Sequence, residues 1–145
     1  MSVSGLQIIL FAAVVIGAIP LLRLVACHER EAKQRRISDR PDMGFDEFYN
    51  AFYSNSGLSA AVVCRLLNEV AEATGLPSHK LRPSDRFDRE LAPVRGSEFG
   101  DGLALLTAQV EQRLKTAHLT ADTSSIKTLG DFIERMGRID PGQSH

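Results

Sequence analysis

The apolar stretch from Leu6 to Leu22 constrains the fold more than any other part of the chain. Its 17 residues carry no charge, and Gln7 is the only polar side chain among them. As a helix rising about 1.5 Å per residue it spans about 26 Å, close to the bilayer hydrocarbon thickness of about 30 Å. The long stem of Arg23 lets the residues up to 26 lie in the same apolar layer. We therefore expect a membrane anchor within residues 1–27 that contacts lipid over residues 6–26.

Three other interpretations of this stretch stay open. A cleaved secretory signal carries basic residues ahead of its apolar run, whereas Met1–Gly5 has none. A lipoprotein signal places small residues before a lipidated cysteine, as Leu24–Cys27 does, but Arg23 stands where that motif has an uncharged residue. A helix buried in the protein is the third. The retained anchor is favoured, because the basic residues all follow the apolar run.

Residues 28–44 read as a charged linker, with Pro41 and Gly44 at its end. Basic residues beside a transmembrane end favour the cytoplasmic side, which predicts a single pass with the N-terminus outside and the C-terminal domain in the cytoplasm. The acidic residues of the linker weaken any attraction to anionic lipid. The basic residues are Arg30, Lys33, Arg35, Arg36 and Arg40.

Composition argues against several functional classes. The net charge of −1 does not suit a nucleic-acid-binding protein, which usually has a strong basic surplus. Cys27 and Cys64 make no disulfide framework, and Cys64 is expected to be an inert core thiol. The four histidines show no metal-ligand spacing, and no phosphate loop or catalytic motif occurs, so we expect neither a metal site nor an enzyme.

The segment 45–53 is rich in aromatic residues. Phe45, Phe48, Tyr49 and Phe52 fall on one face of a helix. This stripe either docks on a partner or the membrane interface, or packs on the rest of the domain. Packing is favoured, because the neighbouring acidic residues at 46 and 47 would be repelled by an anionic bilayer.

Three further helical patterns predict an all-α domain over residues 45–137, with three main helices and one short one. The first main helix follows the turn at 54–57 and ends at Gly75; the second covers 97–115; the third starts at Thr128 and ends at Gly137, before a flexible tail at 138–145. Thr128 and Asp131 have the spacing of a capping box. The long connection at 76–96 must be pinned to the core, with Asp85 capping a short turn, and residues 120–125 hold one turn. The expected apolar positions are Val63, Leu66, Leu67 and Val70 in the first helix, Leu76, Leu81, Phe87 and Leu91 in the connection, Leu103, Leu106, Val110 and Leu114 in the second, and Leu129, Phe132, Ile133 and Met136 in the third.

Residues 60–136 resemble the acyl carrier proteins. The stretch LLNEVAEATGLPSHKLRPSDRFDREL is similar to the first helix and loop of that family, ALLTAQVEQRL to its second helix, and SSIKTLGDFIERM to its ending. The resemblance implies the carrier fold. In that family an Asp-Ser-Leu motif opens the second helix, and its serine carries a 4′-phosphopantetheine arm that holds an acyl group.

That motif is missing here. Counting forward from Leu91 puts Arg95 at the serine position, while counting back from Leu114 puts Gly100 there, so an insertion lies at this point. Ser97 is the nearest hydroxyl, followed by the acidic Glu98 in reversed order. Ser97 is either the attachment site or a helix N-cap.

Two functions follow from these patterns. The first is a non-catalytic, membrane-tethered protein-interaction domain on an acyl-carrier-like scaffold that has lost its prosthetic group. The second is a membrane-anchored carrier modified at Ser97. In the family, acidic residues on the second helix meet basic partner surfaces; here Glu98 and Asp101 lie among cations, which predicts weak electrostatic steering. The aromatic stripe is the other interaction candidate. If it packs on the bundle, we expect it to close the groove that a carrier opens for its acyl chain.

Overall fold

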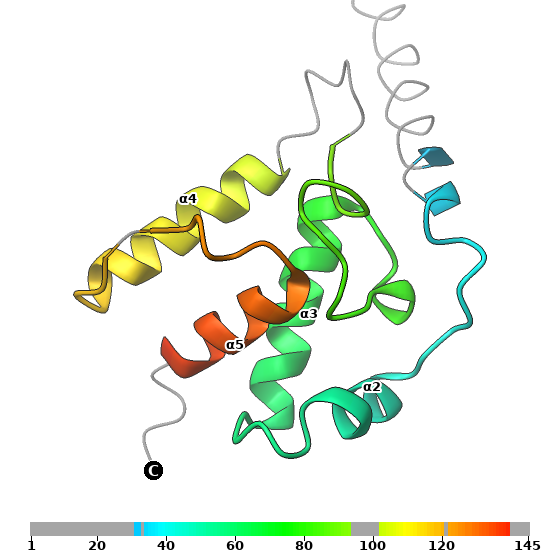
Figure 1. The fold of residues 1–145 in the computed structure, drawn as a ribbon, viewed down its shortest axis with the longest axis horizontal. Helices are drawn as coiled ribbons and strands as arrows, with labels where there is room; N and C mark the ends of the chain where they lie inside the picture. Colours follow the sequence, from blue (N-terminus) through cyan, green and yellow to red (C-terminus); the bar gives the residue numbers. More distant parts are fainter. Residues whose placement is uncertain (1–30, 33, 94–101, 121, 140–145) are drawn as a thin grey trace, which may run out of the picture.

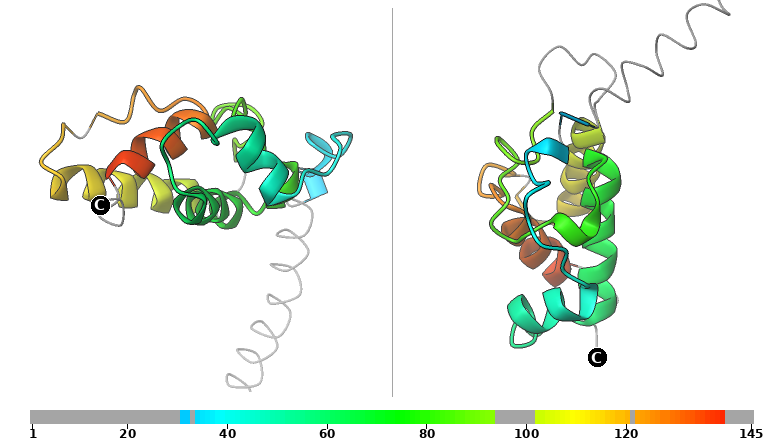
Figure 2. Two further views of the ribbon diagram at one scale, coloured as in Figure 1. Left: turned by 90° about the horizontal axis from the view of Figure 1, so that it is seen from below. Right: turned by 90° about the vertical axis from the view of Figure 1, so that its right-hand side faces the viewer.

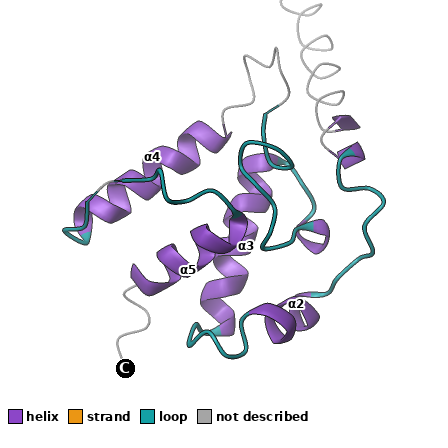
Figure 3. Cartoon of the chain, viewed as in Figure 1, coloured by secondary structure: helices purple, strands orange, loops and turns teal. Residues whose placement is uncertain are grey.

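The computed structural model describes residues 31–32, 34–93, 102–120 and 122–139 of the 145-residue chain. Within these ranges, four α-helices and one 3-10 turn are joined by loops (Figures 1 and 3). No strand occurs among the described residues, so the prediction of an all-α bundle is confirmed. The elements are α2 (Phe45–Phe52), α3 (Ala60–Thr74), η1 (Ser78–Lys80), α4 (Gly102–Thr116) and α5 (Leu129–Ile139).

Helix α3 is the centre of the bundle. The Ser59 side chain caps its start by accepting a hydrogen bond from the Val62 N–H, and Gly75 ends it in the left-handed conformation with φ of 70°. Its apolar stripe is buried, as the residue spacing predicts. Helix α3 packs against α2, η1, α4 and α5, so this one helix contacts every other named element of the fold.

The helices form two layers. Figure 2 shows α3 and α4 side by side in one layer, with α5 and the loop after α3 in the other. A Cβ atom at Gly102 would collide with the Ala73 carbonyl oxygen, so glycine is needed where α4 starts against the end of α3. Further along, the Arg113 guanidinium donates two hydrogen bonds to the Glu69 carboxylate, at 2.9 and 3.0 Å. These contacts align the two helices of the first layer.

The long connection after α3 is pinned to the core, as the sequence predicts. Leu76, Leu81 and Leu91 are buried, and Phe87 is partly buried. Residues 124–125 form a turn before α5, closed by the Ile126 N–H, which donates to the Thr123 carbonyl at 3.0 Å.

Helix α5 begins as predicted and ends differently. The Asp131 N–H donates to the Thr128 hydroxyl at 3.1 Å, and the Thr128 N–H donates to the Asp131 carboxylate at 2.8 Å, which completes the capping box. The predicted C-cap at Gly137 is wrong, because the helix continues to Ile139. Gly137 is buried instead, where a Cβ atom would lie 2.9 Å from Leu58 Cδ2. Close packing therefore explains this glycine.

Cys64 is partly exposed and accepts a weak hydrogen bond from the Asn68 amide, so its assignment to the core is wrong.

The predicted anchor at 6–22 and most of the predicted tail lie outside the described residues. Within the described ranges, no helix is long and apolar enough to cross a membrane.

Residues 36–43, predicted as part of a linker, lie against the loop after α3; we call them the strap. In Figure 1 the strap is the cyan segment that runs beside η1 toward α2. Ile37 is buried, and the Met43 N–H donates to the His79 carbonyl at 3.0 Å. This part of the linker thus belongs to the folded unit.

Candidate functional site

An apolar groove of about 310 Å³ lies between α4, α5 and the loop after α3. One wall comes from α4 and the other from the loop, the segment before α5 and α5 itself. No lining side chain carries an ionisable group. The lining residues are Phe87, Leu103, Leu106, Thr107, Val110, Thr123, Ile126 and Phe132.

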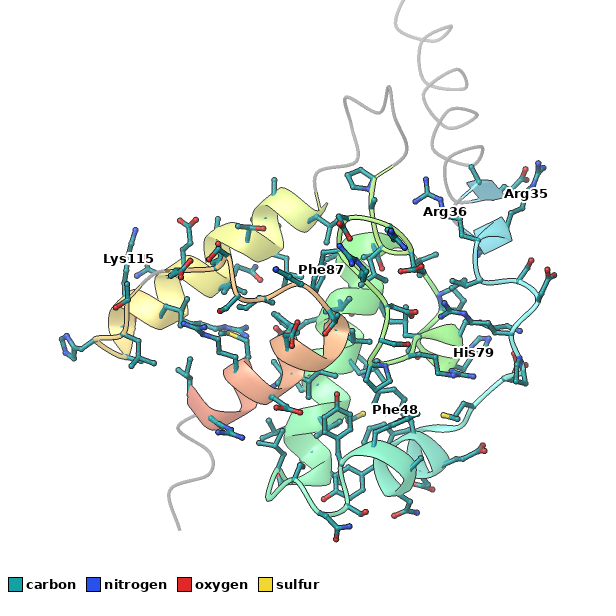
Figure 4. The ribbon with its side chains drawn as sticks, in the orientation of Figure 1. Arg35, Arg36, Phe48, His79, Phe87 and Lys115 are labelled. Atoms are coloured by element: carbon teal, nitrogen blue, oxygen red, sulfur yellow. The ribbon has the colours of Figure 1, made fainter. Side chains whose placement is uncertain are left out.

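Phe87 forms the loop side of the groove, and local hydrogen bonds hold it there. Its N–H donates to the Lys127 carbonyl at 3.1 Å, beside an antiparallel bridge between Arg86 and Thr128. Its ring meets the Phe132 ring edge-on, with centroids 6.2 Å apart. Figure 4 shows Phe87 close to the start of α5. The loop and α5 therefore build this wall together.

The loop also satisfies the first amides of α5. The Leu129 N–H donates to the Asp85 carbonyl at 2.8 Å, and the Gly130 N–H donates to the Pro83 carbonyl at 2.9 Å. Burial acts to raise the pKa of Asp131, but hydrogen bonds from Thr128 and the Lys127 N–H outweigh it and hold that pKa below its ordinary value. The start of α5 is thus bonded to the loop through the Leu129 and Gly130 amides.

Asp85 is the buried polar group of this region, with its side chain only 1% exposed. Its carboxylate accepts hydrogen bonds from Arg40 Nη1 at 2.6 Å and from the Arg82 N–H at 2.8 Å. The second bond closes a turn over residues 82–85, which ends at Asp85, whereas the sequence predicts that Asp85 caps a turn that carries Phe87. Asp88, by contrast, is an exposed partner of Arg86. Asp85 and Asp88 therefore each have an arginine as ion-pair partner.

The sequence did not indicate the partnership of Arg40 and Asp85, because 45 residues separate them. The one available signal was Ile37, an isolated large aliphatic residue within the charged segment 28–42. A buried apolar residue in such a segment indicates that the segment packs on the domain.

The predicted attachment and docking residues of the second helix lie outside the described residues: Ser97, Glu98 and Asp101. The described chain stops at Pro93 and resumes at Gly102. Leu103, which lines the groove, is the next residue. The groove therefore begins close in sequence to the segment that contains Ser97.

The aromatic stripe of α2 packs on the bundle, away from the groove. Phe48 is buried, and the Tyr49 hydroxyl donates to the Leu58 carbonyl at 2.8 Å. Phe45 is partly buried, whereas Phe52 is 47% exposed. No residue of α2 lines the groove, and Figure 4 shows Phe48 and Phe87 in different parts of the bundle. The expectation that the packed stripe closes the groove is wrong, because α2 covers the opposite end of α3.

The described parts of the chain hold no group of three or more histidine, cysteine or carboxylate side chains that could bind a metal ion. His79 is exposed and lies 3.7 Å from the Asp42 carboxylate. No protein-family model, curated protein or solved structure matches the chain, so its function is inferred from its residues and their geometry.

Proposed function

We propose that this chain is a non-catalytic, membrane-tethered binding module whose groove receives apolar side chains of a protein partner. The groove carries the proposal. Its volume of about 310 Å³ is at the lower end of ordinary ligand pockets, about 300–1,000 Å³. Because its lining has no ionisable side chain, it suits burial of apolar surface and lacks a general acid or base.

An acyl-carrier-like scaffold is part of the proposal. The order of α3, a pinned loop, α4, a short connection and α5 agrees with the resemblance of residues 60–136 to that family. The buried leucines of the loop and the capping box of α5 fall within the matching stretches. The tether is the apolar run Leu6–Leu22, and the basic residues that follow it favour a cytoplasmic domain.

A carrier modified with phosphopantetheine at Ser97 is the second candidate. Two observations favour it: the α2 stripe leaves the groove open, and the groove begins at Leu103, soon after Ser97 in the chain. The missing Asp-Ser-Leu motif favours the binding module instead.

The charges along α4 suit apolar rather than electrostatic recognition. Glu111 shares the helix with Arg113, which is already paired with Glu69, and with Lys115 at the far end (Figure 4). Opposite charges mixed on one helix predict little salt dependence of partner binding.

Photocrosslinking tests the groove on the full chain in lipid nanodiscs. The probe is a benzophenone that carries an alkyl chain, and mass spectrometry maps its attachment. We expect attachment around residues 103–110 and 123–132, lost in Leu103→Glu and kept in Leu105→Glu. Leu105 is a matched control because it lies on the same helix, is 63% exposed and does not line this groove. Absence of attachment to these segments in the unmodified sequence would refute the binding role.

Intact mass separates the two candidates. The full chain is incubated with coenzyme A and a phosphopantetheinyl transferase. The binding module predicts an unchanged mass. A gain equal to one phosphopantetheine arm, lost in Ser97→Ala, would establish the carrier.

A further inference from the structure

The strap, residues 36–43, contacts the loop that builds the groove. Its contacts are mostly hydrogen bonds from side chains to backbone carbonyls on the opposite segment, with Ile37 as the buried apolar anchor. Figure 4 shows Arg36 at the start of the strap and His79 beside it. The bonds run from Arg36 Nη1 to the Arg89 and Ala92 carbonyls at 2.9 and 3.0 Å, from Arg82 Nη2 to the Pro41 carbonyl at 2.7 Å, and from Lys80 Nζ to the Ser38 carbonyl at 3.3 Å and the Arg40 carbonyl.

Arg40 joins the strap to the buried carboxylate of the loop. Its guanidinium donates to the buried Asp85 carboxylate at 2.6 Å and to the Lys80 carbonyl at 3.3 Å. A buried carboxylate that loses its cation keeps its desolvation cost without compensation. Without Arg40, the Arg82 N–H is the remaining described donor to Asp85, so the loop conformation around Asp85 loses much of its stabilisation.

Asp85 connects the strap to the groove. Its backbone carbonyl accepts the hydrogen bond of the Leu129 N–H at the start of α5, and two residues further the Phe87 N–H is bonded to Lys127. The Phe87 ring in turn meets the Phe132 ring edge-on in the groove lining. A short path of direct contacts thus runs from Arg40 to the Phe87 wall.

We propose that the strap clamps the Phe87 wall of the groove, so that strap and loop open together as one unit and release of the strap widens the groove. Contacts that are polar and close to solvent open at lower free energy than a buried apolar core. The hydrogen bonds and ion pairs between strap and loop are of this kind, and Ile37 is the one strap residue in the buried core that the loop shares with α3, α4 and α5. The strap follows the predicted anchor and the first part of the charged linker in the sequence. This inference rests on the proposed binding role of the groove.

Hydrogen exchange of the full chain in nanodiscs tests the clamp. In Arg40→Gln we expect exchange to accelerate by about tenfold or more in residues 81–91 and 126–130, and to stay unchanged in residues 106–114 of α4. Arg35→Gln is the matched control, because the Arg35 side chain is 78% exposed and lies 4.0 Å from its partner Glu31. Unchanged exchange in the two segments, or equal acceleration in α4, would overturn the clamp.

A measurement on the unmodified chain keeps the test valid if Arg40→Gln does not fold. The amides of Met43, Phe87 and Leu129 each bridge two of the segments involved. Under increasing urea they should share one opening free energy, below that of the α4 amides. Separate opening free energies for Met43 and the other two would overturn the proposal. Neither measurement uses a groove ligand, so failure of the clamp is distinguishable from failure of the binding role.

Discussion

Replacing Tyr53 with phenylalanine should stabilise the protein. The Tyr53 side chain is 2% exposed, and its hydroxyl has no hydrogen-bond partner among the described residues. A buried hydroxyl without a partner costs about 1–3 kcal/mol. The substitution removes that hydroxyl and keeps the ring, whose centroid lies 5.6 Å from the centroid of the Phe48 ring. We expect the free energy of unfolding to rise by about 1 kcal/mol, equivalent to about 4–8 °C in Tm for a domain of this size.

The stability difference should grow at alkaline pH. Burial, with smaller contributions from Glu134 and Asp131, raises the pKa of Tyr53 well above its ordinary value. The unfolded chain then loses this proton near pH 10 while the folded chain keeps it. The contribution of Tyr53 to stability is therefore complete below about pH 10 and falls above it, by up to about 1.4 kcal/mol per pH unit. Tyr53→Phe has no ionisable hydroxyl at this position, so its free energy of unfolding does not fall for this reason.

The assay is urea denaturation of the full chain in nanodiscs, followed by far-UV circular dichroism between neutral pH and pH 11. Tyr49→Phe is the matched control, because it removes a hydroxyl that does have a partner, the Leu58 carbonyl at 2.8 Å. We expect that control to lose about 0.5–1.5 kcal/mol. The reasoning is refuted if Tyr53→Phe is less stable than the unmodified chain at neutral pH, or if both lose stability equally above pH 10.

Three further predictions concern the core, a close contact and the anchor. Phe132→Ala should lower the free energy of unfolding by about 3–5 kcal/mol, because Phe132 is buried; an unchanged urea midpoint would contradict its place in the core. Gly137→Ala should raise the free energy of unfolding by about 1 kcal/mol, through better helix propensity, only in a chain that also carries Leu58→Ala, which removes the atoms that the new Cβ would meet. Additive effects of the two substitutions in a double-mutant cycle would exclude this contact. Val14→Arg should release the chain from membranes, since a central arginine costs about 2.5–3.5 kcal/mol; unchanged resistance to carbonate extraction would mean that Leu6–Leu22 is not the anchor.

Local physics explains why much of the bundle was predictable. The stripe of α3 repeats with the helical period, and Gly75 ends the helix in a conformation that its own backbone permits. The Thr128 and Asp131 capping box satisfies amides within the same turn. The leucines of the long loop had to be buried somewhere, and all three are. These features depend on residues close together in the chain, which is why the sequence alone determined them.

Other features depend on residues that only the tertiary fold brings together. Gly137 has the sequence signature of a C-cap, yet α5 continues past it to Ile139, and Leu58 packs where a side chain at 137 would lie. The aromatic stripe of α2 predicts a buried face, but tertiary packing decides which end of α3 the stripe covers. Because α2 covers the end away from the groove, the groove stays open. Arg40 meets Asp85 across 45 residues, and a pair of opposite charges at that separation has no periodic signal. The positions of the helices therefore follow from residues close together in the sequence. The groove and the strap depend on contacts between segments that are distant in sequence.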